Sequence, residues 1–186
     1  SYGRPRTDRV ELEKYHEGLI CCSACIGGEI PRYIREDKIK EAKEAALWYK
    51  SIFGDDYYLE LQLHKATVEF ANHNTYKIQE KVNDKLIEFS RELGIKLVCT
   101  NDVHFVDEEH AEAHDRLICL GTGKDLDDPK RMLYTKQEWM KTTAEMNAIF
   151  DYIPEALSNT VEVCNKVESY SIDHAPIMPT FAIPEE

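Results

Sequence analysis

The stretch LVCTNDVHF, residues 97–105, decides the fold of this 186-residue chain. Its first four residues are apolar or β-branched, and Gly94 precedes them as a predicted helix stop. Residues 95–100 are therefore predicted to form a buried strand. The stretch then turns polar, with Asp102 and His104 directly after the strand. A strand that ends in a carboxylate and an imidazole is typical of parallel β/α folds, in which reactive groups collect at the carboxyl ends of strands.

Strands and amphipathic helices alternate along the rest of the chain, which predicts an α/β fold with a parallel sheet. Three strands are few for a closed barrel, so we expect a partial one. Capping boxes at Thr135-x-x-Glu138 and Thr142-x-x-Glu145 mark two short helices, and Pro154 is placed to open the last helix. The predicted strands are 18–22, 57–62 and 95–100, and the predicted helices are 38–53, 78–93, 108–120 (closed by Gly121), 136–141, 143–150 and one from Pro154 with Leu157, Val161 and Cys164 inward.

The composition indicates a soluble globular protein that does not itself grip nucleic acid. Lys and Arg number 23 against 35 Asp and Glu, which gives a net charge of −12. Such a surface repels a phosphate backbone, because affinity for nucleic acid depends on clustered basic residues. No apolar run approaches the roughly 18–20 residues of a membrane span. Cys99, Cys119 and Cys164 lie in apolar sequence, as free thiols of a cytoplasmic protein do.

Asp102 and His104 are the first candidate site residues. Residues two apart in an extended segment point to the same side, so both side chains could reach one point. Cys25 lies at the tip of the first predicted strand, beside Gly27 and Gly28. Carboxylate, imidazole and thiolate are ligands for Zn²⁺ or Mn²⁺. The structural alternative is that Asp102 caps a turn and His104 forms a hydrogen bond on a surface loop, and spacing alone leaves both interpretations open.

Other patterns are weaker signals. Cys22-x-x-Cys25 lacks the second cysteine pair of a zinc ribbon. His110 and His114 share one helix face, but the sequence between them is not that of a zincin, so a solvated face or a supporting role is expected. His64 follows the second strand without a companion. The segment beginning at Gly121 (GTGK) is not followed by the Ser or Thr of a nucleotide-binding loop.

Taken together, several motifs resemble the PHP (polymerase and histidinol phosphatase) domain of the bacterial DNA polymerase III alpha-subunit family. They occur in that family's order and cover nearly the whole chain. The GTGK and Pro-x-Phe segments favour the polymerase branch over free-standing phosphatases. The matching stretches are YHEGLI (15–20), SACIGGEIP (23–31), FGD (53–55), YLELQ (58–62), TNDVHF (100–105), AHD (113–115), GTGKDLDDP (121–129), PEALSNT (154–160) and the PTFAIP tail (179–184).

The resemblance implies a distorted β/α barrel whose cleft binds up to three metals. It assigns Asp102 and His104 as metal ligands and Cys25 as a third. The family's first strands and most of its other ligands would lie upstream, so we expect residues 1–175 to be the C-terminal part of the PHP domain, with its N-terminal strands missing. Residues 176–186 are expected to link it to the polymerase core. The loop 63–75 is longer than the family's usual turn, and its histidines carry no assigned role.

The function expected from the resemblance is that of a piece of a replicative DNA-directed DNA polymerase, its PHP domain being metal-binding, with phosphoesterase or 3'-5' exonuclease activity or a structural role. The alternatives are a stand-alone PHP-type metal phosphoesterase and a non-catalytic scaffold. The metal would be Zn or Mn, or else Mg, and this fragment alone should bind it weakly. Expected partners are the remaining polymerase domains, the proofreading exonuclease, the sliding clamp and, through other domains, DNA. Open sheet edges favour self-association.

Overall fold

The structure, a computed structural model, describes residue 3 and residues 6–178. Its sheet has three parallel strands in the order β1 (Cys21–Cys22), β2 (Tyr57–Leu61) and β3 (Lys96–Cys99). In the register, Leu59 is opposite Leu97 and Leu61 is opposite Cys99. The predicted parallel α/β fold is confirmed, and the sheet is not closed into a barrel.

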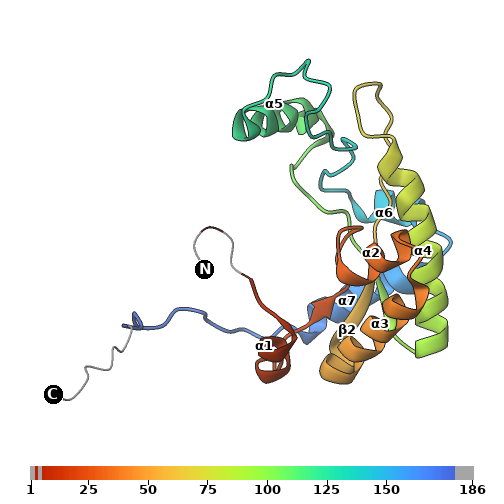
Figure 1. The fold of residues 1–186 in the computed structure, drawn as a ribbon, viewed down its shortest axis with the longest axis vertical. Coiled ribbons are helices and arrows are strands. Elements are labelled where there is room, and N and C mark those ends of the chain that lie inside the picture. The colour runs from red at the N-terminus through yellow and green to blue at the C-terminus, as the bar shows by residue number, and fades with distance from the viewer. Residues whose placement is uncertain (1–2, 4–5, 179–186) are drawn as a thin grey trace.

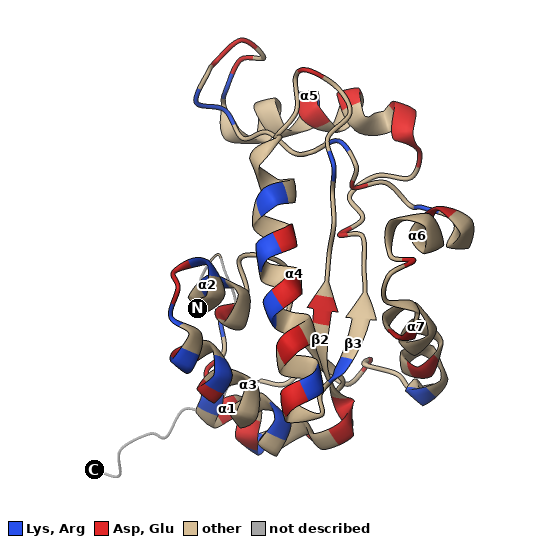
Figure 2. Ribbon diagram, turned by 90° about the vertical axis from the view of Figure 1, so that its right-hand side faces the viewer, with Lys and Arg blue, Asp and Glu red and all other residues tan. Residues whose placement is uncertain are grey.

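Helices flank the sheet on both sides. Figure 2 shows α4 on one side of β2 and β3 and α6 and α7 on the other, with α5 beyond the carboxyl ends of the strands. In Figure 1, α5 is likewise set apart from the sheet. The helices are α1 (Arg9–Lys14), α2 (Glu29–Arg35), α3 (Ile39–Phe53), α4 (Asn74–Leu93), α5 (Ala111–Thr122), α6 (Thr143–Ile149) and α7 (Pro154–Lys166), with 3₁₀ turns at Gly54–Asp56 and Glu108–His110.

The core lies between α4 and the central strand. Val82, Leu86 and Phe89 recur every three or four residues, so they share the face of α4 that packs toward Leu59 and Leu61. The predicted stop at Gly94 is confirmed: this residue has a φ of 64° and follows the last residue of α4. The helices α3 and α4 and the capping box at Thr142 also agree with the sequence prediction.

An ionic cluster holds α7 against the amino end of the sheet. The Tyr58 hydroxyl and the Lys96 ammonium each donate a 2.6 Å hydrogen bond to the Glu162 carboxylate. These two contacts are the main causes that lower the pKa of Glu162 to about 2, and the Lys166 ammonium contributes. The cluster lies at the sheet edge opposite Asp102 and His104, so we interpret it as structural.

Two helix predictions in the loop region are wrong. Residues 136–141 form no helix, because Lys136 has a φ of 64° and Trp139 forms a parallel bridge with Phe105. Of the two hydrogen bonds of a capping box, the one from the Thr135 backbone N–H to the Glu138 carboxylate is present, but the chain bends at Lys136 and does not continue as a helix. Helix α5 continues through Gly121 and ends at Thr122, and Gly123, with a φ of 64°, provides the left-handed cap.

The predicted inward face of α7 is also wrong in part. Ala156 is buried on that helix, whereas Val161 and Cys164 are exposed. The buried face of α7 differs from the predicted face because the Asn159 side-chain amide donates a hydrogen bond to the Leu97 carbonyl oxygen, so that Asn159 faces the sheet. All six cysteines are free thiols; Cys99 and Cys119 are buried, whereas Cys164, for which the sequence predicts apolar surroundings, is exposed.

The chain leaves the fold after α7. Residues 167–178 contain no helix or strand, and most of the predicted linker, residues 176–186, lies outside the described residues. The domain boundary near residue 175 stays a prediction. Among the described helices, none has the length and apolar character needed to cross a membrane.

Candidate functional site

The carboxyl edge of the sheet carries the three predicted site residues. Asp102 and His104 come directly after β3, and Cys25 lies three residues after β1. Because the strands are parallel, these tips lie at the same edge. Asp102 has a φ of 44°, a left-handed conformation that turns the chain sharply at the strand end. Within the described residues, however, no three His, Cys, Asp or Glu side chains converge closely enough to hold a metal ion.

His104 has the hydrogen-bond pattern of a ligating histidine. Its Nδ1 is 2.6 Å from the Asp102 carbonyl oxygen, so we assign the proton to Nδ1, which donates. The lone pair of Nε2 then accepts a 3.3 Å hydrogen bond from the Tyr134 hydroxyl. Metal-bound histidines commonly donate their other N–H to a carbonyl in this way. The donor chemistry therefore fits a metal ligand, although it also fits the structural alternative of a hydrogen-bonded surface histidine.

An aromatic cluster surrounds His104. The ring centroids of Tyr134 and His114 lie 4.8 and 5.4 Å from that of His104, and Phe105 lies 5.1 Å from His114. His114 thus has the supporting position that the sequence left open, whereas the His110 ring accepts the backbone N–H of Asp107 at the start of the 3₁₀ turn.

The pKa of the Tyr134 hydroxyl is shifted by its burial and by the charges at this edge. Its pKa is raised, mainly by burial and then by the negative groups of Asp102, Glu138 and Cys25. Cys25 does not join Asp102 and His104 in a group of three converging ligands among the described residues. Tyr134 was not identified from the sequence, because a tyrosine in a loop carries no spacing signal.

A buried polar segment fixes the turn after β3. The Asn101 amide donates to the carbonyl oxygens of Gln137 (2.9 Å) and Trp139 (2.6 Å), and the His104 backbone N–H donates to the Glu138 carbonyl (2.8 Å). The Glu138 carboxylate, only 3% exposed, accepts from both the backbone N–H and the hydroxyl of Thr135. These contacts hold the Asp102–His104 turn at its place on the sheet edge.

His64 is a buried histidine at this edge, and it has companions that the sequence did not reveal. Its Nδ1 accepts from the Gln79 amide at 3.0 Å, and its Nε2 donates to the Asn101 carbonyl at 3.2 Å. Both ring nitrogens are occupied, so His64 acts as a bridge from α4 to the turn after β3. Burial lowers its pKa, while the Glu138 and Asp102 carboxylates oppose the shift.

We expect His64 to make the folded state sensitive to mild acid. Because its pKa is lowered on folding, the unfolded chain binds the proton more readily, and stability falls as the pH drops below the unfolded pKa of about 6.5. One such group contributes a slope of at most about 1.4 kcal/mol per pH unit. Urea unfolding measured from about pH 5 to about pH 7.5, the range of histidine titration, should show this slope reduced in His64→Gln. His174→Gln, at an exposed position, is the control, and an unchanged slope in His64→Gln would contradict the prediction.

The surroundings of Cys25 are narrow. It lines a cavity of about 10 Å³, a volume of the order of one water molecule, together with Glu60 and Gln62 from the end of β2. Glu60 accepts hydrogen bonds from the Thr100 hydroxyl and from the Gln62 amide. The neighbouring Cys22 is a poor thiolate, because burial and the Glu60 carboxylate raise its pKa to about 12. Cys25, which is exposed at the strand tip, is the member of the Cys22-x-x-Cys25 pair that the family resemblance assigns as a ligand.

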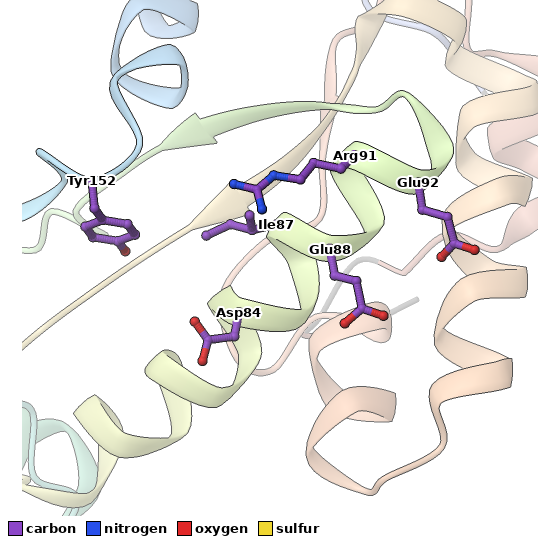
Figure 3. A pocket seen from close by; sticks show the side chains of 6 residues that line it. All are labelled: Asp84, Ile87, Glu88, Arg91, Glu92 and Tyr152. Atoms are coloured by element: carbon purple, nitrogen blue, oxygen red, sulfur yellow. The ribbon is translucent and has the colours of Figure 1, made fainter.

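A concave region elsewhere on the molecule offers less chemistry. Figure 3 shows it along the outer face of α4, with the Arg91 side chain extending over Ile87 toward Tyr152. Its volume is about 810 Å³, but Glu88 and Glu92 are already paired with lysines. We do not assign it a site. Its lining residues are Asp84, Ile87, Glu88, Arg91, Glu92 and Tyr152.

Comparison with known proteins supports the family predicted from the motifs. Residues 1–64 match the PHP domain family. The DNA polymerase III subunit alpha of Borreliella burgdorferi is 44% identical over 187 residues, which cover all of this chain and 15% of that protein. The proteins of the same name from Treponema pallidum and Thermus aquaticus are 36% identical over 187 residues and 38% identical over 166 residues.

These relatives are much longer than the chain. The alignments cover 100% and 87% of this chain but only 15% and 13% of the Treponema pallidum and Thermus aquaticus proteins. The chain therefore spans about one seventh of the length of the curated relatives that it matches. With the PHP match, the parallel sheet and the end-to-end alignment taken together, the chain belongs to the DNA polymerase III alpha-subunit family, as a segment that includes PHP-domain sequence.

Proposed function

We propose that this chain is the later part of the PHP domain of a cytoplasmic bacterial replicative DNA polymerase. Polymerisation of DNA would reside in other domains, and this segment would associate with them and, in the replisome, with a proofreading exonuclease and a sliding clamp. The observation that carries the proposal is the alignment of the entire chain with DNA polymerase III alpha subunits. The sheet is open, with β1 as an edge strand, and an open edge would favour self-association of the isolated chain.

We further propose that Asp102, His104 and Cys25 contribute ligands to a divalent metal centre in the intact polymerase. His104 offers the Nε2 lone pair, Asp102 an exposed carboxylate and Cys25 an exposed thiol, all at one sheet edge. The imidazole nitrogen and the thiol sulfur favour Zn²⁺ over Mg²⁺, and the carboxylate is also a suitable ligand for Mn²⁺. An ion bound there would supply Lewis acidity for phosphate-ester hydrolysis, including 3'-5' exonuclease chemistry.

A scaffold function is the second candidate, and a specific observation favours it. The described residues contain no converging group of three potential ligands, and the two ring nitrogens of His104 already have partners within the chain. A domain with this arrangement could position the polymerase domains without binding a metal. The two candidates differ in what they predict for metal binding, so a binding measurement separates them.

The test is a Zn²⁺ titration of the purified chain in competition with a chromophoric chelator. We expect weak binding, because few ligands of the centre lie in this chain. His104→Ala and Asp102→Ala should each weaken it by at least about tenfold, whereas His174→Ala, at an exposed position, should not. Absence of binding to the unmodified chain would support the scaffold, and equal binding by His104→Ala would refute the assigned ligands.

Activity assays complete the test. Incubated with Zn²⁺, Mn²⁺ or Mg²⁺, the chain should neither extend a primer nor hydrolyse phosphate esters, because an incomplete centre does not activate water efficiently. The net charge of −12 also disfavours a phosphate-rich substrate. Metal-dependent hydrolysis that is abolished by Asp102→Ala would show that the active site is complete within these residues, and would favour a stand-alone phosphoesterase.

A further inference from the structure

The loop between β2 and α4 has a defined conformation that the proposed function does not explain. Three contacts fix it. The Asn72 backbone N–H donates to the Tyr134 carbonyl at 2.9 Å, and the Gln137 amide donates to the Thr67 hydroxyl at 3.3 Å. Within the loop, the His73 Nε2 lies 2.9 Å from the Val68 carbonyl oxygen, to which it donates. These contacts hold the loop in one conformation beside the segment that follows α5.

The loop between β2 and α4 and the start of α5 line a groove of about 450 Å³. Val68 and Phe70 make it apolar on the loop side, and Phe70 is 72% exposed. An aromatic side chain at that exposure, in a concave and fixed surface, is typical of a contact site for another molecule. The groove is lined by Thr67, Val68, Glu69, Phe70, Glu108, Glu109, Ala111, Glu112 and Lys136.

The charge of the groove specifies the kind of partner. Four glutamates face one lysine. Glu112 is paired only with Arg116 at 3.4 Å on the exposed side of α5, and Glu69, Glu108 and Glu109 form no salt bridge with any described residue. The carboxylates do not form a cation site either, since no group of three metal-type ligands converges anywhere among the described residues. The unpaired negative charge of the glutamates therefore lies in the same groove as the apolar side chains of Val68 and Phe70.

We propose that this groove binds a basic segment of a partner protein, in which an apolar side chain packs on Phe70 and Val68 while flanking Lys or Arg residues pair with the glutamates. The apolar contact would supply the binding energy at the centre, and the charged rim would supply specificity and rate of association. A nucleic acid does not fit, because its phosphates would meet uncompensated carboxylates. This inference does not depend on the metal centre.

The test uses fluorescein-labelled eight-residue peptides in which a Leu-Phe, Ile-Trp or Val-Tyr pair is flanked on each side by three Lys or Arg residues. Fluorescence anisotropy with the unmodified chain should show saturable binding to at least one of them, and the affinity should fall as salt is added. Peptides with the same apolar pairs flanked by Asp and Glu should not bind.

Matched variants locate the binding. Phe70→Ser should weaken it about tenfold, and the double variant Glu69→Lys with Glu108→Lys should weaken it at least about tenfold and reduce its salt dependence. The controls are Tyr170→Ser and Glu168→Lys, an exposed aromatic and an exposed acid away from the groove, which should bind like the unmodified chain. Circular dichroism of each variant establishes that it is folded.

Several outcomes would overturn the proposal. No binding by any basic peptide up to millimolar concentration, or equal binding of the acidic peptides, would remove the complementarity argument. If Glu168→Lys lost as much peptide affinity as the double variant Glu69→Lys with Glu108→Lys, only the overall charge of the chain would matter. Unchanged binding by Phe70→Ser would place the contact elsewhere, and tighter binding of a single-stranded oligonucleotide or of a second copy of this chain would identify a different occupant.

Discussion

Replacing Phe89 with alanine is expected to lower the free energy of unfolding by about 3–5 kcal/mol, which is a large part of the stability of a domain of this size. Phe89 is 1% exposed and belongs to the same core cluster as Leu59 and Leu86. The substitution removes the ring and leaves a cavity that α4 and the sheet cannot close without moving. Urea denaturation followed by circular dichroism measures the change.

The control for Phe89→Ala is Tyr170→Ala, because that aromatic side chain is 78% exposed and lies outside the core. Its free energy of unfolding should stay within about 0.5 kcal/mol of the original value. A loss below about 1 kcal/mol in Phe89→Ala would mean that α4 is not packed on the central strand as described.

The fold could be predicted from the sequence where local pattern and tertiary packing agree. Helices α3 and α4 have a regular apolar stripe, and β3 is a short strand with three buried apolar residues that follows Gly94. Helices α1 and α2 were not predicted, since six and seven residues are too few to show a period. Residues 136–141 were mistaken for a helix because a capping-box hydrogen bond can also close a turn, and the competing bridge between Phe105 and Trp139 is a long-range contact.

For the candidate site, the sequence predicted which residues lie at the carboxyl edge of the sheet but not which side chains contact them. Parallel strands place Asp102, His104 and Cys25 at one edge, and that inference needs no side-chain geometry. The partners of these residues come from segments far along the chain, such as Tyr134 beside His104 and Gln79 beside His64. No spacing rule connects such residues, because their contact depends on how the loops between the elements fold back.

The second large effect is expected at Asp115, which anchors α5. Its carboxylate receives two hydrogen bonds from the Arg131 guanidinium, at 2.5 and 3.0 Å, and the two side chains are only 11% and 8% exposed. The pair joins α5 to the loop that leads to Tyr134, and Asp115 follows His114, which packs beside His104. Removing one partner leaves a buried charge without compensation, so Asp115→Ala should cost about 3–5 kcal/mol.

Three variants separate this ion pair from a general effect of charge on α5. Glu112→Ala breaks the pair with Arg116, whose side chains are 72% and 62% exposed, and should cost at most about 0.5 kcal/mol. The double variant Asp115→Leu with Arg131→Met replaces both charges with apolar groups and should recover most of the stability lost in Asp115→Ala. Hydrogen exchange should locate the loss in Asp115→Ala to α5 and the loop after it, while α4 and β2 keep their protection. Uniform loss of hydrogen-exchange protection across the sheet, or equal losses of stability in Asp115→Ala and Glu112→Ala, would contradict the assignment. The Asp115–Arg131 ion pair should affect only the elements that it joins, and it should do so because its charges are buried.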